Sequence, residues 1–212
     1  MTTSLVLDDV TIRLGQRTLL AVSHRVAPGE VLTVMGPSGS GKSTLLAYIG
    51  GFLDPAFTAA GRVLAGEVDL TGLPAEDRHA GILFQDPLLF PHMSVAGNLL
   101  FAIPAQVRGK AARVALAEGA LEGVGMDGMG GRDPDTLSGG QKARVALARV
   151  LLSSPRALLL DEPFSKLDAG LRRQMRELVF EKARLSGLPM LLVTHDEADA
   201  AAAGGPVIRI GT

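Results

Sequence analysis

The chain has 212 residues, enough for one domain with a substantial core but too few for two comfortable ones. Its 21 Lys and Arg residues nearly balance its 22 Asp and Glu residues, which excludes the strong positive charge of a dedicated nucleic-acid-binding protein. Without any cysteine it can form neither disulfides nor thiolate metal sites, as is typical of proteins in a reducing cytoplasm.

The first part of the chain predicts strands joined by turns, followed by a helix. The opening segment, "MTTSLVLDDVTIRLG", has two aspartates in its apolar region and no basic start, so we expect a strand and no signal peptide. The third strand runs directly into a group of glycines. In order, the expected elements are strands over 4–14, 18–27 and 30–35, a helix over about 42–52, and strands near 61–70 and over 80–85.

The middle of the chain, from Pro87 to Val150, is rich in Ala, Gly and apolar residues at helical spacing. We interpret it as an inserted helical subdomain. After Pro155 strands and helices alternate again, which predicts a parallel sheet covered on both faces. The expected elements there are strands over 156–163, 189–196 and 206–210 and a helix over about 169–186.

The apolar stretches are too short to cross a bilayer, which takes ~20 residues. The longest are residues 45–53 and 189–194. We therefore expect a soluble protein, which can still sit on a membrane partner. Because the sequence ends shortly after His195, we also expect no C-terminal regulatory domain.

The segment "GPSGSGKST" matches the P-loop pattern G-x-x-x-x-G-K-[ST] and lies between a predicted strand and a predicted helix. In a P-loop the glycines let backbone N–H groups converge on phosphate oxygens, while Lys42 adds a charge and the Ser43 hydroxyl can bind Mg²⁺. An ordinary glycine-rich turn is the alternative, and it would not require the whole pattern. The predicted nucleotide contacts are Gly36, Pro37, Ser38, Gly39, Ser40, Gly41, Lys42, Ser43 and Thr44.

Polar residues at the ends of three other predicted strands complete the expected site. Asp161 ends the apolar strand "RALLLDEP" and is expected to hold Mg²⁺, and the next residue, Glu162, can accept a proton from the attacking water. Gln85 and His195 also end strands, and open α/β sheets bind ligands beyond the carboxyl ends of their strands. Taken alone, the acidic pair would be a solvated loop, Gln85 a surface residue and His195 a capping or half-buried histidine.

A second anion site is predicted at "TLSGGQKARVAL", residues 136–147. Ser138 and two glycines open an amphipathic helix there. A serine cap and glycines that allow close approach are typical of an anion-binding helix end.

Together these residues resemble the ATP-binding cassette (ABC) ATPases, over residues 4–210 and with six motifs in family order. The resemblance covers residues 36–44 (Walker A), Gln85 (Q-loop), 137–141 (signature), 158–163 (Walker B), 165–168 (D-loop) and His195 (switch histidine). It implies a single α/β domain over 1–212. Residues 1–86 and 151–212 would form a P-loop NTPase (RecA-like) core with an N-terminal antiparallel β subdomain, and residues 87–150 the α-helical signature subdomain.

The resemblance also implies hydrolysis of Mg·ATP by a homodimer. Lys42 and the P-loop would position the phosphates, Glu162 would polarise water and His195 would hold the γ-phosphate. The implied Mg²⁺ ligands are Ser43, Gln85 and Asp161. The residues implied to act in trans, on the ATP of a second subunit, are Ser138, Gly139, Gly140, Gln141 and Asp168.

The segment "DPLLFPHMSVAGNL", residues 86–99, is similar to the importer-type sequence that receives a cytoplasmic helix of a membrane permease. An apolar groove, or else subdomain core, would be formed there by Phe90, Pro91, Met93 and Val95. Within the family, "ILFQDPLLF" and "LLLDEPFSKLD" resemble the Ynj-type bacterial importer ATPases. The implied partners are transmembrane permease subunits and an external substrate-binding protein, with no nucleic acid, and the implied place is the cytoplasmic face of the inner membrane, as a peripheral protein.

Other functions stay open at this point. Transport in the opposite direction would make the chain an exporter or lipoprotein-release type ATPase. A soluble ABC ATPase working on DNA or ribosomes would need coiled-coil insertions or a second cassette, and a regulatory module without turnover would be expected to lack Glu162 or His195. A P-loop kinase has no use for "LSGGQ".

Two residues depart from the family pattern. Lys166 stands in the D-loop where a small residue is usual, and this could alter contacts across the dimer. The aromatic residue that stacks on adenine is expected near Leu14, yet no Phe, Tyr or Trp precedes Tyr48. We therefore expect weak selection of the base, with Arg13 or Arg17 able to lay a guanidinium over it.

Overall fold

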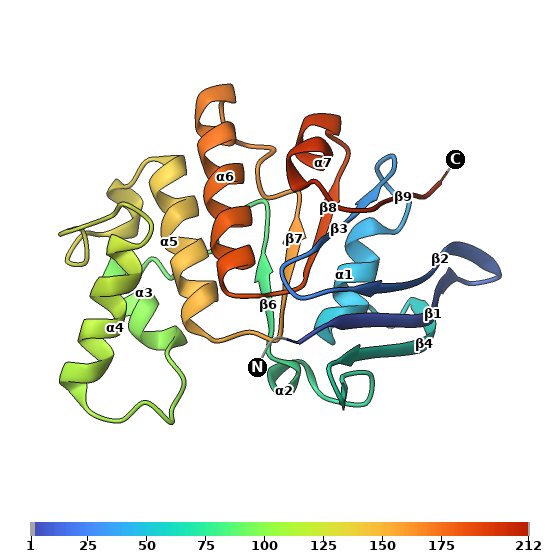
Figure 1. Cartoon of the computed structure of the whole chain (residues 1–212), viewed down its shortest axis with the longest axis horizontal. Helices are drawn as coiled ribbons and strands as arrows, with labels where there is room; N and C mark the ends of the chain where they lie inside the picture. The colour runs from blue at the N-terminus through green and yellow to red at the C-terminus, as the bar shows by residue number, and fades with distance from the viewer. Residues whose placement is uncertain (1–2, 212) are drawn as a thin grey trace. The chain divides into compact units, whose positions relative to one another are not determined.

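The computed structural model describes residues 3–211 (Figure 1), so residues 1–2 and 212 of the expected domain lie outside the described part. The chain forms two compact units. The first contains residues up to Ile82, Arg156–Glu162 and residues from Phe180 onwards, and the second contains Leu83–Pro155 and Pro163–Val179.

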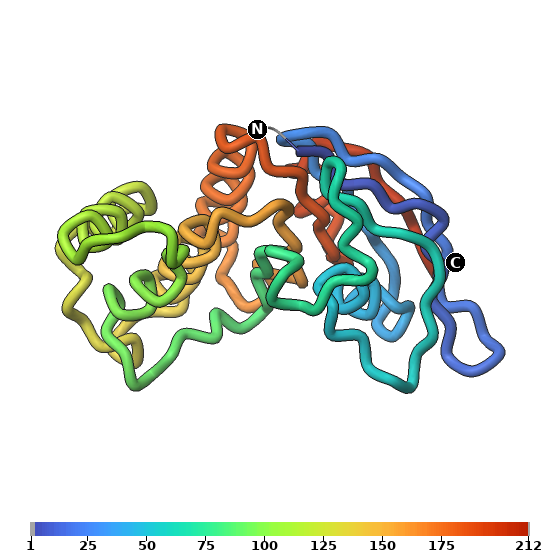
Figure 2. The backbone as a smooth tube through the Cα atoms, turned by 90° about the horizontal axis from the view of Figure 1, so that it is seen from below, coloured from blue at the N-terminus to red at the C-terminus, as the bar shows by residue number. Residues whose placement is uncertain are grey.

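The first unit begins with an antiparallel sheet of four strands in the order β2-β1-β4-β5. The strands are β1 (Leu5–Leu14), β2 (Arg17–Val26), β4 (Phe57–Ala65) and β5 (Val68–Asp69). Buried and more exposed residues alternate along β1, because one face of the sheet packs on the core. In Figure 2 the blue strands β1 and β2 run beside the teal strand β4, as their pairing requires.

A parallel sheet in the order β6-β7-β8-β3-β9 follows. Its strands are β3 (Val31–Met35), β6 (Ala80–Leu83), β7 (Ala157–Asp161), β8 (Met190–Thr194) and β9 (Val207–Arg209). Every residue of β3 and β8 is buried, as expected for strands with both faces covered. Met35 pairs with Thr194 and Asp161 with Val193, so these strands end together at one edge.

Helices and a shared core join the two sheets of the first unit. Helix α1 (Lys42–Gly50) packs against β7, and α7 (Glu197–Ala203) packs against β8 and β3 (Figure 1). The buried Arg78, in the short helix α2 (Ala75–Arg78), donates to the carbonyls of Tyr48 and Ile49 at the end of α1. The core contains apolar residues of both sheets and of α1, among them Leu5, Ile12, Leu45, Ile49, Leu159 and Leu191.

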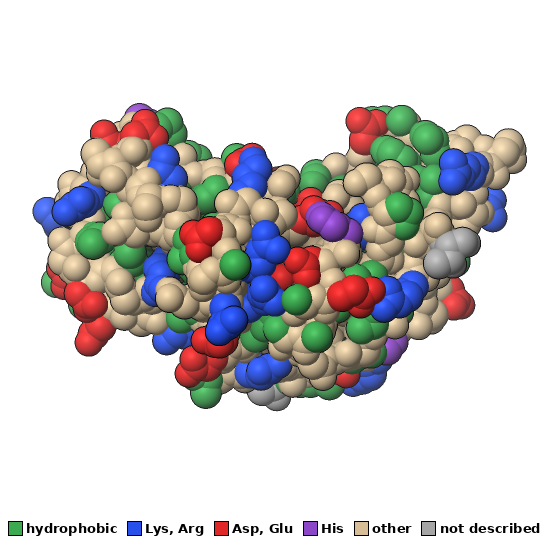
Figure 3. All heavy atoms as spheres, turned by 90° about the horizontal axis from the view of Figure 1, so that it is seen from above, with side chains coloured by type: hydrophobic (Ala, Val, Ile, Leu, Met, Phe, Trp, Pro, Cys, Tyr) green, Lys and Arg blue, Asp and Glu red, His purple; other side chains and the backbone are tan. Residues whose placement is uncertain are grey.

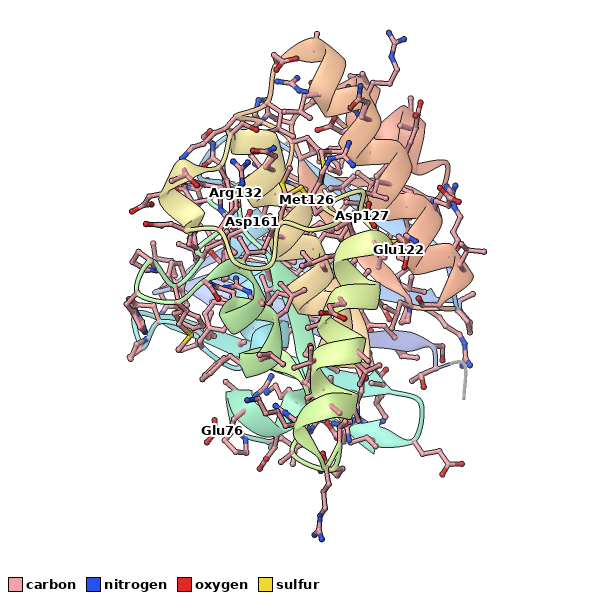
Figure 4. The ribbon with its side chains drawn as sticks, turned by 90° about the vertical axis from the view of Figure 1, so that its left-hand side faces the viewer. Glu76, Glu122, Met126, Asp127, Arg132 and Asp161 are labelled. Carbon is pink, nitrogen blue, oxygen red and sulfur yellow. The ribbon has the colours of Figure 1, made fainter. Side chains whose placement is uncertain are left out.

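The second unit is built mainly from helices. They are α3 (Val95–Ala102), α4 (Lys110–Glu122), the 3₁₀ turn η1 (Pro134–Thr136), α5 (Gly139–Leu152) and the first part of α6 (Ala169–Leu185). Helices α3, α4 and α5 pack against one another. Figure 4 labels Glu122 at the end of α4, and Met126 and Asp127 in the loop that follows; of these, Met126 is buried. Within residues 3–211, no helix combines the length and the apolar character that a membrane span needs.

The expected mixed α/β fold, with an antiparallel and a parallel sheet, is confirmed. Most expected boundaries lie within two residues of the observed ones, but two strands need correction and one helix was not expected. Strand β4 begins at Phe57 and continues through Gly61, whose φ of 93° and close approach to Asp9 fit the irregular pairing of β1 and β4. Strand β6 ends at Leu83, before Gln85. The unpredicted α7 is capped by Asp196, whose Oδ1 accepts from the N–H groups of Ala198 and Asp199.

Candidate nucleotide site

The P-loop connects the end of β3 to the start of α1. Two of its positions suit glycine better than any residue with a side chain. A side chain at Gly36 would put its Cβ 2.5 Å from the carbonyl oxygen of Ile210. Gly41, which precedes α1, has a φ of 95°, a left-handed conformation that side chains disfavour. The conformation of the loop between β3 and α1 therefore depends on these two glycines.

The N-terminus of α1 is open to a ligand. Among the described residues no side chain caps this helix, so its first N–H groups stay available for an anion. Lys42 is 6% exposed, and its Nζ donates to the carbonyls of Gly36 (2.9 Å) and Pro37 (3.0 Å). The ammonium group is thus held inside the loop, 4.0 Å from Oε1 of Glu162.

Asp161, at the end of β7, accepts a hydrogen bond from the Ser43 hydroxyl, with 3.0 Å between Oγ and Oδ1. Burial raises the pKa of the Asp161 carboxyl, and the nearby charge of Glu162 raises it further, while the Ser43 hydrogen bond and the charge of Lys42 lower it. A carboxylate beside a hydroxyl at a phosphate site is a donor set that suits Mg²⁺, which takes one or two protein oxygens together with phosphates and water. Among the described residues, no three His, Cys, Asp or Glu side chains are grouped so that they could hold a metal ion.

Glu162 lies between two cationic or ionisable neighbours. Its Oε1 is 3.0 Å from Nδ1 of His195 and 4.0 Å from Nζ of Lys42, and its side chain is 24% exposed. Its backbone N–H donates to the carbonyl of Val193, which ties it to β8. The φ of Glu162 is 45°, a left-handed value that is uncommon for a residue with a side chain and is often found at functional sites.

A cavity of about 350 Å³ opens in front of these groups. Its lining includes residues of the P-loop and α1, namely Ser38, Gly39, Gly41, Lys42, Ser43 and Thr44, together with Glu162. It also includes Leu14, Arg17, Leu19 and Phe57, from three strands of the antiparallel sheet. Positive and negative side chains are interspersed on the molecular face drawn in Figure 3. The cationic residues that line the cavity itself are Arg17 and Lys42.

The first unit therefore brings together most of the residues predicted for the site: the P-loop, Asp161, Glu162 and His195. Sequence reasoning missed Phe57, the aromatic residue of the cavity. The cavity lining includes Arg17 but, among the described residues, not Arg13. Only the pairing of Leu14 with Phe57 could have revealed this aromatic, and residue spacing does not give that register.

The remaining predicted residues, Gln85, Ser138 to Gln141 and Asp168, belong to the second unit, and their contact with nucleotide stays a prediction. Ser138 caps α5 as expected: its Oγ accepts from the Gln141 N–H (3.3 Å), and Oε1 of Gln141 accepts from the Ser138 N–H (3.0 Å). Asp168 similarly accepts from the N–H groups of Gly170 and Leu171 at the start of α6.

Lys166, the unusual D-loop residue, forms an ion pair inside the second unit. Its Nζ lies 2.5 Å from Oδ1 of Asp86, which directly follows Gln85. Both side chains are exposed, so the pair adds little to stability. It does link the D-loop to the residue next to Gln85.

The segment expected to receive a permease helix is divided between core and surface. Val95 is fully buried in the second unit, so for this residue the core interpretation is correct. The Phe90 ring contacts the more exposed Phe101 ring edge-on, with 5.1 Å between centroids, and the Arg149 guanidinium lies 5.6 Å from the Phe90 centroid. Phe101 is 66% exposed, an apolar surface residue that the sequence pattern did not single out.

Comparison with known proteins identifies close relatives of this architecture. The family model described as "ABC transporter" matches residues 19–165. The chain is 48% identical to "Uncharacterized ABC transporter ATP-binding protein YnjD" of Escherichia coli, over 93% of this chain and 91% of that one. It is 43% identical to "Putative 2-aminoethylphosphonate import ATP-binding protein PhnT" of Salmonella typhimurium and 41% identical to "Fe(3+) ions import ATP-binding protein FbpC" of Brucella abortus. These alignments cover 94% and 97% of this chain, and 54% and 58% of the two relatives.

Proposed function

Because this chain belongs to the ATP-binding proteins of the ABC transporter family, and is therefore an ATPase, we propose that it drives a membrane permease by hydrolysing Mg·ATP as a homodimer. The observation that carries the proposal is the group formed by Lys42, Glu162 and His195 beside the P-loop, in which Oε1 of Glu162 lies 4.0 Å from Nζ of Lys42 and 3.0 Å from Nδ1 of His195. A carboxylate held between an ammonium and an imidazole is well placed to act on a water at the γ-phosphate.

In the proposed reaction the free N–H groups of α1 and Lys42 bind and orient the phosphates. Glu162 accepts the proton of the attacking water at Oε1 or Oε2, and His195, which contacts Oε1, holds the γ-phosphate side of the site. Ser43, Asp161 and Gln85 would hold Mg²⁺, which when bound neutralises charge on the β- and γ-phosphates. Most of the rate acceleration then comes from positioning and charge.

Dimerisation is proposed through the N-terminus of α5. The Ser138 Oγ accepts one hydrogen bond within its capping box, which leaves its own O–H free to donate. The N–H groups of Gly139 and Gly140 add a second positive helix end, which suits the γ-phosphate held by a partner's P-loop. Two identical chains would then share two composite sites about a twofold axis, with Asp168 near the contact.

The permease partner is proposed from the relatives and from the surface of the second unit. Two of the relatives are named as import ATP-binding proteins, which supports import rather than export. Phe101, with Leu88 at 57% exposure, offers apolar surface near Phe90 for a cytoplasmic helix of the permease. The chain would act peripherally, at the cytoplasmic face of the inner membrane, alongside an external substrate-binding protein.

The function is tested by measuring the phosphate that the purified chain releases from Mg·ATP. The measurement is made first with the chain alone and then with candidate permease subunits reconstituted in liposomes. The proposal expects hydrolysis by the chain and stimulation by the permease. A chain that hydrolyses ATP but neither binds nor responds to the permease would favour the soluble non-transport alternative.

Phe101→Asp is expected to weaken binding to the permease at least tenfold, about 1.4 kcal/mol, because a carboxylate would lose its water in an apolar contact. Phe101 gives a cleaner test than Phe90, where a new carboxylate could pair with Arg149. Co-purification of tagged chain with permease measures the effect. Leu116→Asp, at an exposed apolar position on α4, is the matched control. A large drop in the thermal midpoint of Phe101→Asp, or unchanged binding, would contradict the docking role.

A further inference from the structure

Three side chains stand opposite one another on the strands that border the phosphate cavity. Leu14 at the end of β1 pairs with Arg17 at the start of β2 and with Phe57 at the start of β4. Directly opposite residues of antiparallel strands project from the same face, with Cβ atoms about 4.5–5.5 Å apart. The three side chains therefore form one row, and all three line the cavity.

The Phe57 ring has a fixed place in this row. It packs against the hydrophobic core of the first unit on one side and borders the cavity on another, so it is half-buried. A ring held in this way offers a flat apolar face without losing much rotamer freedom when a ligand binds. Leu14, by contrast, is 47% exposed and has no ring.

The lining of the cavity combines the two kinds of contact that a nucleoside triphosphate needs. The P-loop residues supply backbone N–H groups and Lys42 for phosphates, and the strand residues supply Leu14, Leu19 and Phe57, with the cationic Arg17. We propose that Phe57 stacks on the base of the bound nucleotide, supplying from β4 the aromatic ring that is missing near Leu14. This inference rests on the proposed function, because it specifies how the same site holds ATP.

Stacking on Phe57 determines how selective the site is. Every base has a π-face, so a ring supports stacking without reading the hydrogen-bonding edge that distinguishes adenine from guanine. The Arg17 guanidinium can lie over a purine in the same unselective way. GTP should consequently bind within about tenfold of ATP, a gap of about 1.4 kcal/mol.

The test measures affinity by calorimetric titration of ATP, GTP and inorganic tripolyphosphate in the presence of Mg²⁺. Phe57→Ala and Phe57→Leu are expected to weaken ATP and GTP about tenfold or more, since stacking on an aromatic contributes roughly that much, and to leave tripolyphosphate unchanged. Phe57→Trp should restore both nucleotides. Phe52→Ala, at a 47% exposed phenylalanine of the first unit that lies outside the cavity lining, is the matched control and should bind all three ligands as the wild type does.

Each result decides the inference. If Phe57→Leu binds ATP as tightly as the wild type does, the inference is overturned. It is also overturned if Phe57→Leu loses as much affinity for tripolyphosphate as for ATP, because Phe57 would then act by stabilising the P-loop. Phe57→Leu keeps apolar volume in the core, so it answers the question if Phe57→Ala fails to fold. If the wild-type chain hydrolyses ATP and Phe57→Leu binds ATP normally, only the stacking proposal is refuted. If the wild-type chain does not hydrolyse ATP, the proposed function is refuted.

Discussion

Glu162→Gln is expected to bind ATP as tightly as the wild type while releasing phosphate about 10²–10⁴-fold more slowly, the usual contribution of a general base. The amide has the shape of the carboxylate and can still hydrogen-bond to Nδ1 of His195, so the site should keep its form. It cannot accept the proton of the attacking water. With hydrolysis blocked, ATP should stay trapped and the dimer should persist.

Two measurements check this result: phosphate release under saturating Mg·ATP, and the elution volume in size-exclusion chromatography with ATP. Glu67→Gln, an exposed glutamate between β4 and β5, removes the same charge elsewhere in the first unit and should behave as the wild type. A monomeric Glu162→Gln chain with full turnover would exclude the general-base role.

Ser138→Arg should lower ATP hydrolysis by about a hundredfold or more, comparable with the loss of a preorganised donor to a developing charge. The arginine would fill the space that the partner's γ-phosphate must enter at the start of α5. Binding of ATP to the P-loop of the same chain should remain, because Lys42 and the N-terminus of α1 belong to the other unit. Hydrolysis measurements together with nucleotide titration separate the two effects.

The substitution also removes a helix cap, which costs roughly 0.5–2 kcal/mol of stability, so its unfolding midpoint must be compared. Ser153→Arg, at the opposite end of α5, controls for the bulk and charge of the new side chain.

Mixing the Ser138→Arg chain with a Lys42→Ala chain gives the sharpest evidence for action in trans. Neither variant alone can form a complete site. In a mixed dimer one site pairs an intact P-loop with an intact Ser138, so about a quarter of the wild-type activity should return if pairing is random. If the mixture stays as inactive as its parts, the signature residues do not act across a dimer.

The positions of many residues in the candidate phosphate site could be predicted from the sequence because the signals are local. The glycine pattern before Lys42 needs a strand before it and a helix after it, and both are found. Asp161 ends one apolar strand, and Glu162 and His195 each come directly after an apolar strand. Parallel strands align their carboxyl ends, so the convergence of these residues follows from topology.

The aromatic residue that we propose to stack on the base could not be predicted, because its position depends on strand register. Phe57 is far from Leu14 in the chain, and the expected strand near 61–70 excluded it altogether. The sequence pattern predicts a strand start near Gly61, whereas Gly61 lies within β4 beside an irregularity in the pairing with β1. Val95 shows the same limit, since the apolar spacing of 90–95 does not distinguish groove from core.

The left-handed backbone of Glu162 implies a conflict between the stability of this protein and its turnover of ATP. Such a conformation costs a non-glycine residue about 1–3 kcal/mol, and glycine would adopt it with less strain. The chain nevertheless carries at this position the carboxylate proposed to take the proton. Selecting variants for heat resistance alone would therefore favour glycine at position 162 and discard turnover, so a thermostabilised form of this ATPase should be sought elsewhere in the fold.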